Sequence, residues 1–290
     1  MDISNLKAFV SIANTGSFSL ASEELFLTQP AISKRIASLE SELNTPLFDR
    51  IGRKVRLTAA GETLYTHAQL ILKEVNNAKQ SVINLSDSIQ GELKIATSHH
   101  IGLHRLPSVL THYVANYPSV DLAIEFMDSE DACKLIEQGE IELAIVTLPL
   151  TPIPNLHQKL IWDDPLSFVV NKNHELCGLK ITLQDLTSHA AVLPSHGTFT
   201  REVIQQLFAK NHLDLNIRMS TNYLETIKML IQVGLGWGVL PNSMLDNKLV
   251  TLKVPKVKIA RQLGIVWHAK HSLSNPAQAL MDYLLTNKNS

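Results

Sequence analysis

Residues 27–36, LTQPAISKRI, limit the fold of this chain more than any other segment. They predict a helix although they include Pro30, because a proline in the first helical turn lacks only an N–H that would have no intrahelical partner. Apolar residues at helical spacing form one face, namely Ile32, Ile36, Leu39 and Leu43. Small, polar and basic residues form the opposite face, so we expect one side to pack on a core and the other to meet a partner.

Two further helices are predicted before this one. The first carries apolar residues at helical spacing, namely Ile3, Leu6, Phe9, Val10 and Ala13, with Asp2 as its N-cap. Residues 14–17 break it, Ser19 caps a second short helix, and Thr28 caps the helix that contains Pro30. Two short helices before a polar, basic helix are typical of a helix-turn-helix, and the alternative is a small helical bundle with an ordinary exposed face.

The polar face of the third helix has the chemistry to contact DNA. Gln29 can pair with adenine in the major groove, and Lys34 can reach guanine or phosphate. Ser33 and the first backbone N–H groups suit phosphate oxygens. The candidate DNA-binding residues of this segment are Thr28, Gln29, Pro30, Ser33, Lys34 and Arg35.

A basic segment follows at residues 50–56, which contain no acidic residue. It predicts a hairpin, or wing, whose arginines enter a narrow minor groove, and Arg50, Arg53 and Lys54 are its candidate DNA contacts. A solvated basic turn is the alternative. Thr58 would cap the long helix that comes next.

Apolar residues along this long helix repeat at steps of four and three. The heptad pattern predicts a dimer seam formed by Leu64, Ala68, Ile71, Val75, Ala78 and Val82. The alternative is a helix that lies on a domain surface, which favours a broader apolar stripe. A dimer also suits DNA recognition, because paired modules read paired half-sites.

After Gly91, predicted strands alternate with predicted helices. The strands are residues 93–97, 120–126, 143–147, 166–170, 190–193, 216–220, 238–240 and 263–267, and the helices are 104–117, 132–137, 200–210, 224–233 and 277–285. This alternation predicts α/β architecture with parallel sheets. No dinucleotide fingerprint and no P-loop is present in the sequence.

The N-terminal residues resemble the winged helix-turn-helix of LysR-type transcriptional regulators. The matching positions are Phe9, Gly16, Ser17, Ala21, Leu25, Gln29, Pro30, Ala31, Ser33, Leu39, Glu40, Leu47, Phe48, Arg50, Leu57, Thr58, Ala60 and Gly61. Two positions depart from the family pattern: Ser22 replaces an alanine, and Asn44 replaces a glycine. Asparagine tolerates left-handed backbone, so neither departure removes DNA binding.

The resemblance extends over nearly the whole chain. Residues 139–145, with Glu142 for the usual Asp, and residues 233–241, with a bulky Trp237, match segments of the family's effector domain. It implies a winged helix-turn-helix at residues 1–58, a dimerising linker helix at 59–90 and a two-lobed, periplasmic-binding-protein-like effector domain at 91–290. Lobe I would be about residues 92–162 plus 267–290, with lobe II at 163–266 between them.

Ligands in such α/β folds bind at the carboxyl ends of strands, between the lobes. By resemblance, two polar loops and one strand end line the pocket, and the candidates are Thr97, Ser98, His99, His100, Thr147, His196, Gly197, Thr198 and Phe199. Ordinary helix caps are the alternative. The carboxylates of Asp128, Glu130 and Asp131 are expected at a different strand end, which favours a small anion or carboxylate as effector. An apolar molecule beside Phe199 and Trp237 is the competing prediction.

Histidines and cysteines offer further chemistry. His99, His100, His104 and His196 could gather at one mouth, as a metal site or a proton-sensitive anion site, but scattered polar histidines are the simpler interpretation in a chain with 12 of them. We therefore expect no metal and no cofactor other than the effector. Cys133 and Cys177 form no disulfide framework, although a redox pair between the lobes is an alternative.

Three classes of function remain. We expect a ligand-responsive transcription factor, whose partners are double-stranded DNA, a small-molecule effector, a second copy or three further copies of itself, and RNA polymerase. A solute-binding protein is disfavoured because the N-terminus lacks a signal peptide, and an enzyme because no nucleophile elbow or acid/base pair is present. No run of about 18 apolar residues predicts a membrane span, and a reducing cytoplasm is expected.

Overall fold

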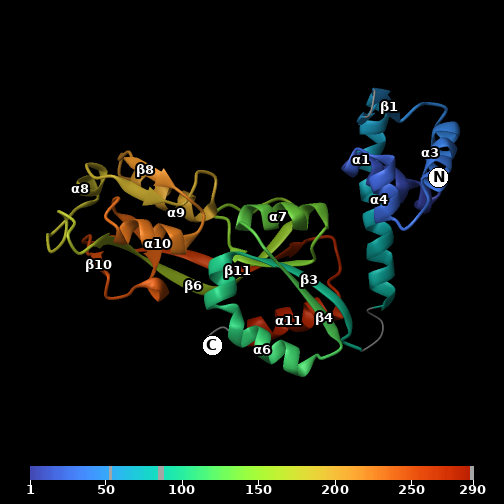
Figure 1. Cartoon of the computed structure of the whole chain (residues 1–290). Helices are drawn as coiled ribbons and strands as arrows, with labels where there is room; N and C mark the ends of the chain where they lie inside the picture. The colour runs from blue at the N-terminus through green and yellow to red at the C-terminus, as the bar shows by residue number, and fades with distance from the viewer. Residues whose placement is uncertain (52–53, 84–87, 288–290) are drawn as a thin grey trace. The chain divides into compact units, whose positions relative to one another are not determined.

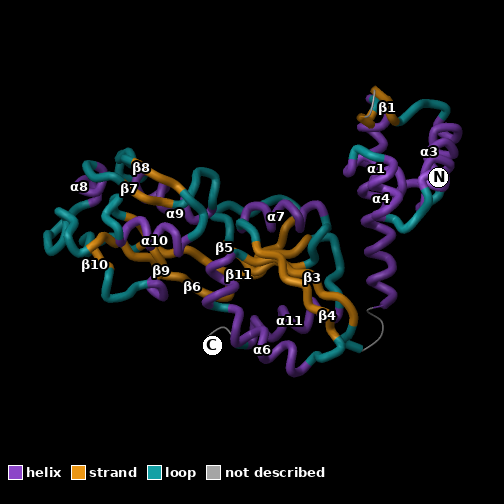
Figure 2. The backbone as a smooth tube through the Cα atoms, viewed as in Figure 1, coloured by secondary structure: helices purple, strands orange, loops and turns teal. Residues whose placement is uncertain are grey.

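The computed structural model describes residues 1–51, 54–83 and 88–287, which form two compact units, residues 1–85 and 86–290 (Figure 1). The first unit is mostly helical, and the second mixes helices and strands (Figure 2). Among the described residues, none of the helices is long and apolar enough to cross a membrane.

The first unit is a winged helix-turn-helix. Its elements are α1 (Ile3–Thr15), α2 (Phe18–Glu24), α3 (Gln29–Leu43), β1 (Phe48–Ile51), β2 (Lys54–Leu57) and α4 (Ala59–Ile83). The predicted apolar face of α3 enters the core, where Ile32, Ile36 and Leu39 pack with Phe9 of α1. The hairpin β1–β2 is antiparallel, as expected of a wing.

Local signals set where these helices begin and end. Asp2 caps α1 by accepting a 2.7 Å hydrogen bond from the Ser4 N–H, as predicted. The cap of α2 is Ser17, not the predicted Ser19, since the Ser17 hydroxyl accepts from the Leu20 N–H at 3.4 Å. Thr28 stands at the N-cap of α3 but makes no capping hydrogen bond with its side chain. A helix boundary read from sequence is therefore accurate to a few residues.

Three positions explain how α3 and α4 connect. Asn44 ends α3 with φ of 50°, the left-handed backbone expected for a residue in the place of a glycine. Thr58 begins α4, because its hydroxyl accepts from the Gly61 N–H at 3.0 Å. At Gly61 an added Cβ would lie 2.2 Å from the Leu47 carbonyl oxygen, so a glycine lets α4 lie directly on the chain before the wing.

The first part of α4 belongs to the core of its own unit. Ala68 is fully buried there, and Leu64 and Leu72 pack against the same cluster. The predicted inclusion of Ala68 in a dimer seam is therefore wrong, because its side chain has no surface left for a partner. Further along, Ile71 is 37% exposed and Val82 is 67% exposed, so an apolar face begins beyond the unit's core.

The second unit contains a seven-stranded sheet in the order β10–β6–β11–β5–β3–β4, with β9 also paired to β6. A separate parallel pair joins β7 and β8. The elements of its first half are β3 (Gly91–Thr97), α5 (His99–His104), α6 (Leu106–Asn116), β4 (Val120–Phe126), α7 (Ser129–Gln138), β5 (Leu143–Thr147) and β6 (Leu156–Asn171). Those of its second half are α8 (Leu183–Thr187), β7 (Ala191–Leu193), α9 (Phe199–Ala209), β8 (Ile217–Ser220), α10 (Leu224–Gln232), β9 (Gly238–Pro241), a 3₁₀ turn (Asn242–Met244), β10 (Leu249–Leu252), β11 (Ile259–His268) and α11 (Asn275–Thr286).

The large sheet is mixed, which corrects the expectation of parallel sheets. Strands β3, β4 and β5 are parallel, whereas β11 runs antiparallel to both β5 and β6. Strands β6 and β11 are also longer than predicted, because the whole of β11 pairs with residues 156–166 of β6. The predicted helix at residues 104–117 is α6, and the short helix α5 precedes it and meets it at Arg105. The short strand β10 was not predicted.

The alternation of β5 shows how one strand serves two cores. Leu143 and Ile145 join a cluster with α6 and α11, and Ala144 and Val146 join another with α7. Figure 1 shows α6 and α11 on one side of these strands and α7 on the other. Two more clusters, around Trp237 and around Leu240, form the second lobe at the far ends of β6 and β11. The unit therefore has two lobes joined by long strands.

Candidate functional site

The exposed surface of α3 begins at its first turn. Gln29, Pro30 and Lys34 are exposed, and Ser33 is half-buried beside them. Their opposite neighbours Ile32 and Ile36 are in the core, so the helix presents an amide, an ammonium group and a hydroxyl on one side. This is the donor and acceptor set that reads base edges and phosphates.

Arg35 points elsewhere. Its guanidinium donates a 3.3 Å hydrogen bond to the Ser4 carbonyl oxygen, near the start of α1. The predicted set on α3 is thus divided: Thr28, Gln29, Pro30 and Lys34 are exposed, whereas Arg35 fastens α3 to α1.

The wing carries the remaining predicted DNA contacts. In the hairpin, Arg50 is opposite Val55, and Arg56 is opposite Asp49. Arg53 lies outside the described residues, and only the backbone of Arg50 and Lys54 is described. Asp49 is an acidic partner directly across from Arg56, so the wing is less purely basic than residues 50–56 alone suggest.

A pocket lies between the two lobes of the second unit, with an empty volume of about 510 Å³. Its lining is polar and comes from both lobes. The lining residues are Ser98, His99, His100, Asp128, Ser129, Glu130, Thr147, Pro194, Thr198, Thr200, Asn222, Leu224 and Arg261. The carboxyl ends of β3, β4 and β5 meet here, which is where α/β folds bind ligands.

Two carboxylates of lobe I are bonded to lobe II across this pocket. Glu130, in the first turn of α7, accepts a hydrogen bond from the Phe199 backbone N–H at the start of α9. Asp128 accepts one from the Asn222 side-chain amide, whose oxygen in turn accepts from the Ser195 N–H at 3.1 Å. Burial raises the pKa of Glu130, and the backbone hydrogen bond from Phe199 opposes that shift. A carboxylate of the protein itself thus occupies the start of α9.

Arg261 lies at the floor of the pocket and is almost fully buried. Its Nε donates to Asp164 at 2.8 Å and its Nη1 donates to the Thr200 hydroxyl at 2.9 Å. Arg105 shares the same carboxylate, 3.2 Å from Asp164 Oδ1. Asp164 is 1% exposed and therefore serves two guanidinium groups. Within the described chain, Nη2 of Arg261 has no hydrogen-bond partner and is buried.

Five of the nine predicted effector contacts line this pocket, namely Ser98, His99, His100, Thr147 and Thr198. Thr97 does not, because it is fully buried and its hydroxyl donates to the Ile145 carbonyl at 2.8 Å. His196 and Gly197 are exposed outside the lining. The Phe199 side chain packs into the lobe I cluster around α7, and only its N–H faces Glu130.

Two sequence expectations about the pocket are wrong. Asp128 and Glu130 line it, whereas a lining almost free of carboxylate was expected. Trp237 is buried in the lobe II core, where its indole N–H donates to the Leu186 carbonyl at 2.8 Å, so it offers no apolar wall. Asp128 stands just after β4, and the strand-end rule could have found it. Arg261 lies within β11, where no local motif marks it.

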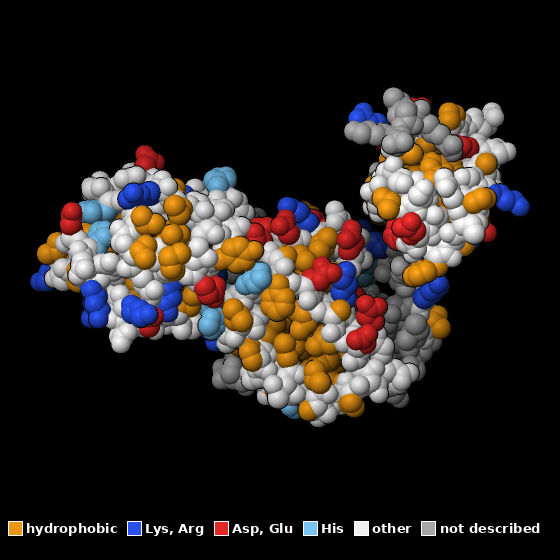
Figure 3. Space-filling model, in the orientation of Figure 1, with side chains coloured by type: hydrophobic (Ala, Val, Ile, Leu, Met, Phe, Trp, Pro, Cys, Tyr) orange, Lys and Arg blue, Asp and Glu red, His pale blue; other side chains and the backbone are white. Residues whose placement is uncertain are grey.

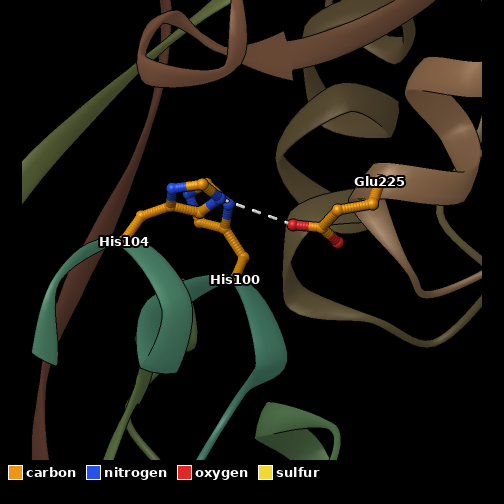
Figure 4. Close-up of side chains that lie close together, drawn as sticks. All are labelled: His100, His104 and Glu225. Carbon is orange, nitrogen blue, oxygen red and sulfur yellow. Dashed lines mark ion pairs between the residues drawn. The ribbon is translucent and has the colours of Figure 1, made fainter. Parts of the chain in front are cut away.

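The histidines divide into different surroundings. His99 stacks on Phe126 and lies 5.0 Å, between ring centroids, from Tyr223 of lobe II. His100 and His104 have ring centroids 4.7 Å apart on α5 and point toward Glu225 of α10 (Figure 4). Histidine and acidic side chains lie near one another where the two lobes meet (Figure 3).

The two cysteines are both free. Cys133 is buried in the α7 cluster of lobe I, and Cys177 is half-buried. Burial raises the pKa of the Cys133 thiol to about 12, so it is protonated and unreactive at neutral pH. The alternative of a redox pair between these cysteines has no support in this structure.

Comparison with known proteins places these features together. The family model described as "LysR substrate binding domain" matches residues 86–288, and "Bacterial regulatory helix-turn-helix protein, lysR family" matches residues 3–62. The HTH-type transcriptional activator CmpR of Synechocystis sp. is 26% identical over 287 residues, which cover 97% of this chain and 94% of that protein.

Solved structures share the fold. A full-length OxyR variant from Pseudomonas aeruginosa superposes with a TM-score of 0.72 at 23% identity, covering 99% of this chain and 94% of that one. The regulatory domain of CcmR from Synechocystis PCC6803, in complex with 2-PG, gives a TM-score of 0.62 at 26% identity and covers 69% of this chain and 99% of that one.

Proposed function

Because the chain belongs to the LysR family of bacterial transcriptional regulators, we propose that the exposed side of α3 reads an operator and that the interlobe pocket binds the effector. The chain regulates transcription through a helix-turn-helix DNA-binding domain and an effector-binding domain. The residues that carry each task are our proposal. They rest on the exposure of the α3 side chains and on the polar lining of the pocket.

We place the DNA-binding domain at residues 1–58, the linker helix at 59–90 and the effector domain at 91–290. Lobe I comprises about residues 92–162 and 267–290, and lobe II comprises 163–266. Both lobe boundaries fall inside the long strands β6 and β11, so bending of these strands is the natural way for the lobes to move.

On the DNA, Gln29 makes a base contact and Lys34 contacts a guanine or a phosphate. Ser33 and the first turn of α3 bind phosphate, and Pro30 keeps the edge of the helix slim. Arg50, Arg53 and Lys54 of the wing add phosphate or minor-groove affinity. Thr28 stands at the N-cap of α3, next to Gln29. We leave Arg35 out of the direct contacts, because its guanidinium already bonds the Ser4 carbonyl.

In the effector domain, the observation that carries the proposal is Arg261. Its Nη2 is buried without a partner among the described residues, and Arg261 is one of the residues that line the pocket. A buried unsatisfied guanidinium donor is costly, and an anionic oxygen would satisfy it. Ser98, Thr198 and Thr200 line the same pocket, although the Thr198 hydroxyl also caps α9 by accepting from the Arg201 N–H at 3.3 Å. The effector is therefore a small anion, such as a carboxylate or phosphate ester.

We also propose the partners of the protein and the cellular compartment in which it acts. The regulator works in the cytoplasm as a homodimer or homotetramer, and on the promoter it contacts RNA polymerase. It performs no catalysis and uses no classical cofactor, because its task is to convert effector binding into altered DNA binding. A ligand can do this only through different affinities for two arrangements of the domain.

The effector class is tested by a thermal-shift screen of the full chain. Carboxylates, phosphate, sulfate and 2-PG are compared with amines at equal ionic strength. We expect acids to raise the melting temperature and the double variant Ser98→Ala, Thr198→Ala to reduce that gain. Exposed His196→Ala, outside the lining, is the matched control. Stabilisation by amines alone, or by acids equally in the double variant, would overturn the proposed site.

A further inference from the structure

Three side chains from two lobes come together beside the effector pocket. His100 and His104 lie one turn apart on α5, and Glu225 stands in the first turn of α10 (Figure 4). One ligand atom from each lies within 4.8 Å of the others, and His104 Nε2 is 3.5 Å from Glu225 Oε1. Small rotations of these side chains would bring all three ligand atoms within bonding distance of one ion.

His100 is the side chain that needs an explanation. It is 4% exposed, and neither ring nitrogen has a hydrogen-bond partner within the described part of the chain. A buried imidazole normally has at least one partner, because an unsatisfied polar group is costly. When the ring is neutral, one of these two bare nitrogens has a lone pair that can bind a metal ion. A neutral imidazole is the form that binds metal.

The two helices that carry these side chains, α5 and α10, belong to separate hydrophobic cores. α5 contributes Ile101 to the lobe I cluster, and α10 contributes Leu224 and Ile227 to a lobe II cluster. The ring of His104 and the carboxylate of Glu225 are partly exposed, with side chains 38% and 43% accessible. An ion could therefore reach the cluster from solvent and be held from both lobes.

We propose that His100, His104 and Glu225 bind a divalent transition-metal ion, with zinc the best fit, and that this ion joins the two lobes. Two imidazoles and one carboxylate suit zinc, cobalt or nickel, whereas calcium and magnesium prefer sets made only of oxygen. Three protein ligands leave a tetrahedral ion one position for water or for an anion. The site stands independently of the effector proposal, since its ligands bind without any effector.

Charged side chains near His100 determine how a bound metal ion would affect ligand binding in the pocket. Arg261 and Arg105 are near His100, and Asp164 offsets part of their charge. A bound dication would add positive charge to a pocket that His100 also lines. Metal and an anionic ligand should therefore bind more tightly together than apart, and this coupling is the same in both directions.

Sequence alone pointed away from this site. From the sequence, His100 and His104 form a possible cluster with His99 and His196, and no metal site is expected there. Glu225 supplies the third ligand from an element more than a hundred residues later, and no short motif joins it to α5. The set is brought together because α5 of lobe I and α10 of lobe II lie next to each other.

The test uses the full chain stripped of metal with a chelator and then titrated with Zn²⁺ by calorimetry, and with Co²⁺ by visible absorption. We expect one site whose cobalt spectrum shows nitrogen and oxygen ligation. His104→Ala and Glu225→Gln should each weaken zinc binding at least about tenfold, because even losing a residue that only supports a metal ligand costs about 10–100-fold in affinity. Both side chains are partly exposed, so these variants should fold, and circular dichroism checks this.

His112→Ala is the matched control, because His112 is an exposed histidine on α6 that stacks on Tyr283. It should bind zinc as the unaltered chain does. Unchanged zinc affinity in His104→Ala or in Glu225→Gln would place the ion elsewhere, for example at the His174–His189 pair, and would overturn the proposal. Absence of zinc binding at micromolar concentration would overturn it as well.

Discussion

Asp164 is a single carboxylate on which two arginines depend. It is 1% exposed, and Arg261 and Arg105 both bond it. We expect Asp164→Asn to lower the free energy of unfolding by about 3–5 kcal/mol, because a buried guanidinium would lose its counter-charge. Urea unfolding measures this. Asp163→Asn, an exposed aspartate one residue earlier on β6, should change stability little, and equal losses in both variants would refute the explanation.

Glu130 should give the protein a measurable pH dependence. Its folded pKa is raised above 4.5 by burial, so above pH 4.5 the folded chain keeps a proton that the unfolded chain has lost. The free energy of unfolding therefore falls as pH rises through that window. Glu130→Gln keeps an acceptor for the Phe199 N–H but cannot titrate, so its stability should fall less than that of the unaltered chain. Asp131→Asn, at the next residue, serves as control in the same pH series.

Gln29 and Lys34 should affect DNA binding in different ways. Gln29→Ala should weaken binding to the native operator by about 1–3 kcal/mol, with little change on unrelated DNA, because it removes a base contact. Lys34→Ala should also weaken DNA binding. If Lys34 contacts phosphate, the variant should reduce the slope of log K against log salt by about one. Fluorescence anisotropy at several salt concentrations measures both. If neither variant bound the operator more weakly, the placement of the interface on α3 would be wrong.

At the scale of elements, α4 changes role along its length. Its first turns belong to the core of the winged helix, and beyond them Ile71 and Val82 are exposed. Ile71→Glu should convert dimers to monomers at micromolar concentration, because a charge buried at the seam costs roughly 3–5 kcal/mol. Sedimentation velocity measures this. Asn76→Glu adds the same charge at an exposed polar position of α4 and should leave the dimer intact.

The same helix shows what sequence can predict. Heptad spacing found the apolar face, since Leu64, Ala68 and Ile71 do lie on one side of α4. It could not say what covers each part of that face, because that depends on contacts with α1 and the wing. Likewise, alternation found β5 and β4 with correct bounds, but pairing direction in the sheet depends on the path of the chain between strands.

At the scale of the whole effector domain, only some of the residues at the pocket could be predicted from the sequence. Polar residues at the ends of β3 and β5 were found from strand-end rules, as Ser98 and Thr147 show. Arg261 and Asp164 come from the middle of β11 and β6, where sequence indicates only a strand. Their side chains meet because those strands pair antiparallel across both lobes, a contact between residues about a hundred positions apart.

The path of the chain through the two lobes has a consequence for its synthesis on the ribosome. Lobe II is made from one internal stretch, so all of its core is synthesised before α11. Lobe I is made from both flanks, and its core includes Ile265, Ala277, Leu280 and Leu284. The earlier strands of lobe I therefore keep apolar surface uncovered until α11 has been synthesised. Removing α11 would leave one face of the lobe I core uncovered, so we expect such a truncated chain to aggregate during expression.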